Sequence, residues 1–142
     1  MIPAPSQGLA DLAMKLATAV APETASRFAM ANTGMISALL GALAGEMEAG
    51  VAHRMADIEE MKALLTAAPE GAGDDPQARA AFVAKQPDSL SLSDVNALHA
   101  EGLTLLVELH AWAEQADATL NTRIWEFLLN HTERHRIELP GL

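Results

Sequence analysis

The stretch FAMANTGMISALLGALAG, from Phe28 to Gly45, contains no charged residue and lies between Arg27 and Glu46. A membrane-spanning helix needs about 20 predominantly apolar residues, whereas this shorter run includes several polar residues and three glycines. Apolar residues continue at spacings of three and four well beyond Glu46, which is the pattern of one long amphipathic helix. We therefore expect a long helix of a soluble protein and no membrane span.

A line of small residues runs beside this apolar edge, and it includes Gly34, Gly41 and Gly45. Each glycine lowers helix propensity by about 0.8–1 kcal/mol relative to alanine. Close approach of another helix, at about 8 Å between the axes, would offset that loss. The sequence predicts such a contact, with a kink or break at Gly34 or Gly50 as the alternative.

A second apolar seam lies in the C-terminal part of the chain, where the spacing alternates between three and four residues from Val95 to Trp112. Seams of this kind pack against facing helices by inserting knobs into holes. We expect an interaction seam that combines the three glycines with Val95, Leu98, Leu105, Leu109, Trp112, Leu120, Ile124 and Phe127.

Proline, glycine and capping residues divide the chain into helices. The predicted elements are a first helix of about Gln7 to Val20, a second from about Pro22 to Ala68, a flexible loop of about residues 69–76, a short helix of about Gln77 to Lys85, and a region capped by Ser91 that continues to about Ile137 with a possible break near Asp117 or Asn121. The expected fold is all-α. It is a single helical domain, residues 1–142, built as a bundle on two long antiparallel helices with shorter N-terminal and connecting helices.

Composition excludes several classes of function. The formal net charge is −10, with only nine Lys and Arg, so the field of the molecule repels phosphate and disfavours nucleic-acid binding. The absence of cysteine excludes disulfides, thiolate zinc sites and cysteine nucleophiles. The N-terminal residues MIPAPSQGLADLAMK show no basic segment followed by an apolar core, so we expect a cytoplasmic protein.

The histidines are the candidates for metal chemistry. His131 and His135 have the i, i+4 spacing that can chelate an ion, but Arg134 beside them adds positive charge. His99 and His110 are about 16 Å apart along one helix, too far to share an ion. The carboxylates Glu46, Glu48, Asp57, Glu59 and Glu60 lack the Glu-x-x-His pairs of di-iron bundles and are expected to form a solvated acidic face. We predict no catalytic residue, cofactor or bound metal.

Two classes of function follow from these patterns. The first is a non-enzymatic helical protein-interaction module, which forms a homodimer or binds an amphipathic helix of a protein client. The alternative is a metal-dependent enzyme or sensor, built in a helical bundle on the histidines with Glu46, Glu48 or Glu108.

Two segments carry a family resemblance: ISALLGALAGEMEAGVAHRMADIEEMKALL, from Ile36 to Leu65, and LLVELHAWAEQADATLNTRIWEFL, from Leu105 to Leu128. Together they resemble the two long helices of FlgN-type flagellar export chaperones. The glutamate-rich middle and the Lys-Ala-Leu-Leu end of the first segment match that family, as does the leucine-containing turn after Gln115 in the second. The resemblance implies a chaperone that binds the C-terminal amphipathic helix of a partner.

Overall fold

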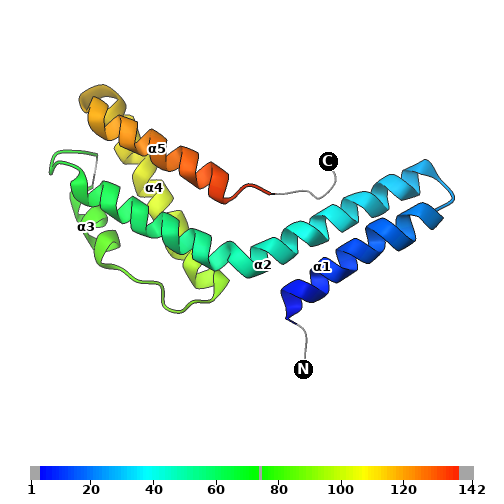
Figure 1. Ribbon diagram of the computed structural model, residues 1–142. Coiled ribbons are helices and arrows are strands. Elements are labelled where there is room, and N and C mark those ends of the chain that lie inside the picture. Colours follow the sequence, from blue (N-terminus) through cyan, green and yellow to red (C-terminus); the bar gives the residue numbers. More distant parts are fainter. Residues whose placement is uncertain (1–3, 74, 138–142) are drawn as a thin grey trace. The chain divides into compact units, whose positions relative to one another are not determined.

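The structure is a computed structural model that describes residues 4–73 and 75–137. Within these residues every regular element is helical and no strand occurs, which confirms the all-α prediction. The elements are α1 (Pro5–Lys15), a π-helical turn η1 (Leu16–Val20), a 3-10 turn η2 (Ala21–Glu23), α2 (Arg27–Ala67), α3 (Pro76–Ala84), α4 (Leu92–Ala116) and α5 (Ala118–Arg134) (Figure 1).

The chain divides into two compact units, where the sequence predicted a single domain. Unit 1 holds the described residues up to Gly50 together with Ile137, and unit 2 spans Val51–Arg136. Helix α2 supplies its first half to unit 1 and its second half to unit 2. The division follows Gly50, but α2 is continuous through Gly34 and Gly50, so the helix break suggested as an alternative at these glycines does not occur.

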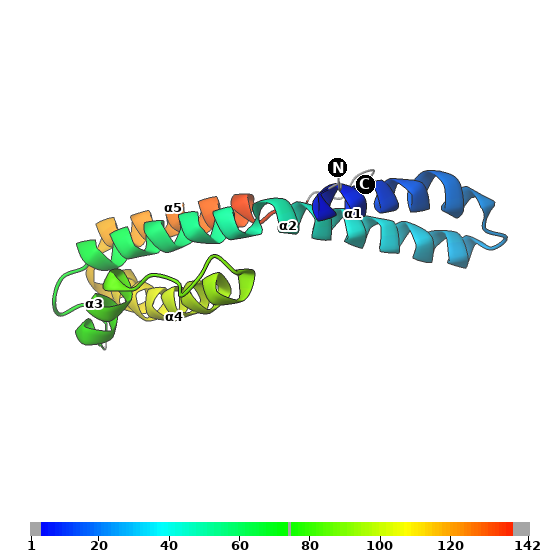
Figure 2. The same cartoon turned by 90° about the horizontal axis from the view of Figure 1, so that it is seen from below.

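Unit 1 is a hairpin in which α1 lies alongside the first half of α2 (Figures 1 and 2). The buried hydroxyl of Ser37 donates to the carbonyl of Ala13 at 2.7 Å, and Ser6 donates to Glu48 at 2.9 Å. Helix α2 begins at Arg27 rather than near Pro22. The reason is local: the side chain of Ser26 accepts a hydrogen bond from the backbone N–H of Ala29 and so caps the helix.

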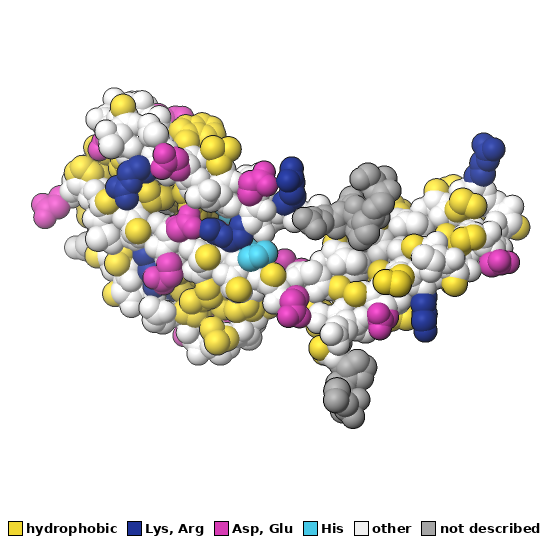
Figure 3. Space-filling model, viewed as in Figure 1, with side chains coloured by type: hydrophobic (Ala, Val, Ile, Leu, Met, Phe, Trp, Pro, Cys, Tyr) yellow, Lys and Arg dark blue, Asp and Glu magenta, His cyan; other side chains and the backbone are white. Residues whose placement is uncertain are grey.

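Much of unit 1 exposes apolar side chains, which Figure 3 shows along its visible face. By length and composition α2 could cross a membrane, and few residues of its most apolar stretch are buried. Those two properties fit both a membrane span and a helix that another protein covers.

Unit 2 packs α3, α4 and α5 with the second half of α2 (Figures 1 and 2). The most completely buried apolar side chains are Phe82, Ile58, Met61, Leu109, Ile124 and Val95. Gly102 of α4 allows this packing, because a Cβ atom there would lie 2.5 Å from Cζ of Phe82 and 2.8 Å from Cε of Met61. The close approach expected at a glycine thus occurs on α4.

The expected second long helix is two helices, so the prediction of two long antiparallel helices is wrong in this part. Asp117 adopts an extended backbone conformation, and its side chain accepts hydrogen bonds from the N–H groups of Thr119 and Leu120 at 3.0 and 2.9 Å. It therefore caps α5 and ends α4 at one of the two positions that the sequence suggested. His110 and Asn121 join the two helices by a 3.0 Å hydrogen bond.

The short elements agree with the prediction. Asp75 accepts hydrogen bonds from the N–H groups of Gln77 and Ala78 and caps α3, with Pro76 in the first turn. Ser91 caps α4 by accepting from the N–H of Asp94 at 3.2 Å. Between α2 and α3 lies the expected loop of about residues 69–76, apart from position 74, which is outside the described residues.

Candidate metal centre

Three helices of unit 2 bring one carboxylate and three imidazole rings together. Asp57 comes from α2, His99 from α4, and His131 from α5, while His135 directly follows the last residue of α5. His131 and His135 share one side of the helix because four residues make about one turn. Asp57 lies one turn before Met61 of the core, which places its carboxylate in the interior.

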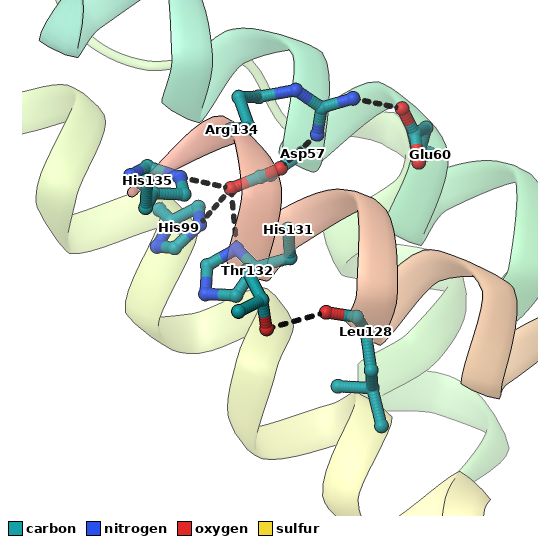
Figure 4. Close-up of polar contacts among 8 residues, drawn as sticks. All are labelled: Asp57, Glu60, His99, Leu128, His131, Thr132, Arg134 and His135. Carbon is teal, nitrogen blue, oxygen red and sulfur yellow. Dashed lines mark hydrogen bonds and ion pairs between the residues drawn. The ribbon is translucent and has the colours of Figure 1, made fainter. Parts of the chain in front are cut away.

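The four side chains converge on a single oxygen atom. Oδ2 of Asp57 lies 2.9 Å from Nε2 of His99, 2.8 Å from Nδ1 of His131 and 2.6 Å from Nε2 of His135 (Figure 4). These four atoms all lie within 4.8 Å of one another. Asp57 is completely buried and His99 nearly so, whereas His131 and His135 keep 28% and 20% of their side chains exposed. An ion could therefore reach the cluster from the side of α5.

The other oxygen of the carboxylate is held by Arg134. One arm of the guanidinium donates to Oδ1 of Asp57 and the other arm donates to Oε1 of Glu60 (Figure 4). This fork fixes the direction in which Asp57 presents Oδ2 to the rings. It also places the positive charge of Arg134 between two carboxylates. In the sequence analysis this charge was an argument against a cation site, but here Glu60 compensates it.

The site favours the ionised form of Asp57 and the neutral form of His99. Burial raises the pKa of Asp57, but hydrogen bonds from His135, His131, His99 and Arg134 outweigh burial and bring that pKa to about 2. Burial lowers the pKa of His99 below its ordinary value of 6.5, and the nearby His131 and His135 lower it further against the opposing effect of Asp57. The charged form of Asp57 and the neutral form of His99 are the forms that bind metal ions.

Oδ2 of Asp57 has more hydrogen-bonding neighbours than it has lone pairs to accept their hydrogen bonds. A carboxylate oxygen has about two lone-pair positions, and three ring nitrogens lie within hydrogen-bonding distance of this one. The rings themselves are close, with centroids 4.5 Å apart for His131 and His135 and 5.6 Å apart for His99 and His131. A cation among the four atoms would satisfy nitrogens and oxygen together, so the donor set fits a metal ion.

Sequence reasoning found part of this site. The chelating spacing of His131 and His135 was recognised, but Asp57 was assigned to a solvated acidic face and is instead completely buried. The signal that could have identified it is its position one turn before Met61 and two turns before Leu64, on an apolar edge. His110 is outside the cluster and bonds Asn121.

The residues of the predicted interaction seam lie in two different environments. Its α4 and α5 members lie in the core of unit 2 or, for Trp112, pack against that core, so the chain itself covers them. Gly34 and Gly45 are exposed, and a Cβ atom added at either would meet nothing within 4 Å in the described residues. Within one chain, therefore, no described helix approaches α2 closely at Gly34 or Gly45, and contact there would have to come from another molecule. Gly41 is partly buried.

Comparison with known proteins adds no assignment: no family model, no curated protein and no solved structure matches this chain. The resemblance to FlgN-type chaperones stays a prediction, and the side chains of the two units carry the functional argument.

Proposed function

We propose that this protein binds one divalent transition-metal ion of the zinc type through Asp57, His99, His131 and His135. The observation that carries the proposal is the convergence of three imidazole nitrogens on one oxygen of a completely buried carboxylate. The sequence favoured the absence of a metal, and the proposal departs from that expectation because Asp57 lies in the interior beside the histidines. It corresponds to the alternative function given in the sequence analysis, a helical bundle that binds a metal ion through its histidines.

The donor set selects the class of ion. Imidazole nitrogen suits Zn²⁺, Cu²⁺, Fe²⁺ and Ni²⁺, whereas Mg²⁺ and Ca²⁺ prefer oxygen ligands. Four protein ligands around Zn²⁺ at bond lengths of 2.0–2.2 Å would be about 3.3 Å from one another in a tetrahedron. The ring nitrogens lie 2.6–2.9 Å from Oδ2 of Asp57. Binding therefore requires the nitrogens and the oxygen to separate by roughly half an ångström, a small movement of side chains.

The proposed role of the ion is to join helices. Its ligands belong to α2, to α4 and to the C-terminal end of α5. With four protein ligands the coordination sphere of a tetrahedral ion is complete, which is the pattern of structural and sensing sites rather than of catalytic ones. Binding would then stabilise unit 2 by mass action, because the unfolded chain does not hold the four ligands together.

The experiment measures zinc binding to the chelator-treated, full-length protein by isothermal titration calorimetry, with bound metal counted by elemental analysis after gel filtration. We expect one Zn²⁺ per chain in the wild type and none in His131→Ala/His135→Ala. The matched control is His110→Ala, which changes a histidine outside the cluster and should retain one ion per chain. Circular dichroism checks that each variant keeps its helices.

Two results would overturn the proposal. One is a folded wild-type protein that binds no stoichiometric zinc, nickel, copper or ferrous ion. The other is a bound ion whose stoichiometry and affinity do not change in His131→Ala/His135→Ala. The cluster would then be a hydrogen-bonded ion pair of Asp57 and Arg134 surrounded by imidazoles.

The second candidate function is that of a helical protein-interaction module, and unit 1 favours it. Large apolar side chains of α1, η1 and α2 that are about half exposed or more include Leu12, Met14, Val20, Phe28, Met35, Ile36, Leu39, Leu43 and Met47. A soluble monomer rarely exposes so many apolar side chains together, and such patches commonly mark protein or membrane contacts. This function is independent of the metal proposal, because its residues belong to unit 1 and the ligands belong to unit 2.

A further inference from the structure

Arg79 of α3 is a buried cation that pairs with no carboxylate among the described residues. Only 7% of the residue is exposed. Its Nη2 donates to the backbone carbonyls of Pro69 and Glu70, at 3.1 and 3.4 Å. Nε and Nη1 are buried and have no hydrogen-bond partner within residues 4–73 and 75–137. Because Nε carries one N–H group and Nη1 carries two, three donors of the guanidinium are unsatisfied.

An unpaired charge in the interior opposes folding. The guanidinium loses its water and gains no anion in exchange, and two backbone carbonyls replace only part of what it loses. Lys62 is equally buried, but its Nζ lies 3.4 Å from Oε1 of Glu59. Since native proteins satisfy the great majority of their buried polar groups, the free donors of Arg79 indicate a partner from outside the described chain.

A pocket of about 300 Å³ lies beside Arg79, a volume at the small end of ligand sites. Its walls come from the end of α2 and from α3, and its lining residues are Leu65, Thr66, Pro76, Arg79, Ala80 and Val83. Arg79 is the charged residue of this set. The hydroxyl of Thr66 already donates to the carbonyl of Lys62 at 2.7 Å. The pocket therefore combines a mostly apolar wall with one cation that lacks a partner.

We propose that this pocket binds a small organic monocarboxylate with an apolar chain. The carboxylate accepts hydrogen bonds from Nε or Nη1 of Arg79, and the chain lies against Leu65 and Val83. A rotation of the guanidinium towards the pocket brings these donors to the ligand and breaks only the longer bond of Nη2, the one to Glu70. The site is separate from the metal centre, because none of its lining residues belongs to that cluster.

Three properties select this class of ligand. A guanidinium and a carboxylate form charge-assisted hydrogen bonds, which are stronger than neutral ones. The apolar wall favours a ligand with an apolar chain, because removing apolar surface from water is favourable. The formal net charge of −10 repels a polyanion more strongly than a ligand with a single negative charge.

The experiment titrates octanoate into the full-length protein by isothermal titration calorimetry. Octanol and acetate are the comparison probes, since octanol keeps the chain without the charge and acetate keeps the charge without the chain. We expect saturable binding of one octanoate per chain, and binding of either comparison probe that is weaker by about tenfold or more. In heteronuclear NMR, octanoate should shift the Nε–H signal of Arg79, which is identified by its loss in Arg79→Lys.

The variants test the position of the ligand. Ala80 is exposed and lines the pocket, so Ala80→Phe should fill the space and abolish saturable binding. Ala81→Phe is the matched control, because Ala81 is exposed on the same helix and does not line the pocket. It should bind octanoate as the wild type does. Arg79→Met removes the donors and should abolish binding with unchanged helix content in circular dichroism, since replacing a buried charge by an apolar side chain is often tolerated.

Three results would overturn the inference. The first is a folded wild-type protein that shows no saturable binding at millimolar octanoate. The second is equal binding of octanol, because the charge of Arg79 would then have no part in recognition. The third is octanoate binding that Ala80→Phe leaves unchanged, which would place the ligand elsewhere, for example on the exposed apolar side chains of unit 1.

Discussion

The carboxylate of Asp57 and the ring of His135 meet at 2.6 Å although 78 residues separate them in the sequence. The contact joins α2 to the end of α5, and His99 adds α4 through the same oxygen atom. Helices α2 and α4 and the end of α5 therefore share one polar junction beside the apolar core of unit 2. A buried junction of this kind makes the stability of unit 2 depend on what occupies it and on its protonation.

Zinc should raise the stability of the folded protein. At a free Zn²⁺ concentration 100 times the dissociation constant, binding to one site on the folded state alone raises the free energy of unfolding by about 2.7 kcal/mol. Urea denaturation with zinc and with a chelator measures the difference. His131→Ala/His135→Ala should show none, and an equal effect of zinc on that variant would contradict the assignment of the ligands.

Acid should destabilise the chelator-treated protein in two stages. The pKa of His99 is lowered on folding, so the unfolded chain binds more protons below about pH 6.5 and stability falls as the pH drops through that value. The pKa of Asp57 falls from 3.8 to about 2, so its contribution of about 2 kcal/mol is present above pH 3.8 and is lost towards pH 2.

Urea denaturation between pH 8 and pH 2 measures both stages. Asp57→Asn should remove the lower stage, because the amide does not titrate. A free energy of unfolding that stays constant from pH 7 to pH 4 would show that folding does not lower the pKa of His99.

The periodic pattern of the sequence predicted most of the helices, but it did not predict which helices contact one another. The seam from Val95 to Leu109 and the caps at Ser91 and Asp75 depend on local spacing, and the structure has them where the pattern places them. The break at Asp117 was open in the sequence because a short polar residue can either continue a helix or cap the next one. Its hydrogen bonds to Thr119 and Leu120 decide the matter.

The metal cluster was harder to predict because it depends on contacts distant in the sequence. Asp57 and His131 are 74 residues apart, and nothing local shows that they meet. The neighbouring Glu59 and Glu60 made Asp57 look like one member of an acidic surface, although it alone points into the core. A similar limit applies to Gly102, because only the tertiary contacts show that a Cβ atom there would lie within 3 Å of Phe82 and Met61.

Removing the cap of α5 should weaken the junction of α4 and α5. Asp117→Ala leaves the N–H groups of Thr119 and Leu120 without their side-chain acceptor, at a cost of about 1 kcal/mol. Asp117→Asn keeps an oxygen in the same place and should be close to wild type in thermal denaturation. Equal stability of the alanine and asparagine variants would mean that the cap contributes nothing.

Gly102→Ala should destabilise unit 2. The added methyl group would lie 2.5 Å from the ring of the buried Phe82 and 2.8 Å from the end of Met61. The ring cannot move without disturbing the core, and overpacking of this kind costs about 1–3 kcal/mol. Chemical denaturation measures the loss. If alanine were neutral or stabilising here, α4 would not approach α3 as closely as the structure shows.

Gly45→Ala makes the same substitution as Gly102→Ala, but at an exposed position. It tests whether another helix packs closely at Gly45. The new methyl group would meet nothing within 4 Å among residues 4–73 and 75–137. Only the helix propensity changes, so we expect the free energy of unfolding to rise by about 1 kcal/mol. Thermal denaturation of Gly45→Ala beside the wild type measures the change in stability. A lower stability would show that another helix does pack on Gly45, as the small-residue line in the sequence suggested.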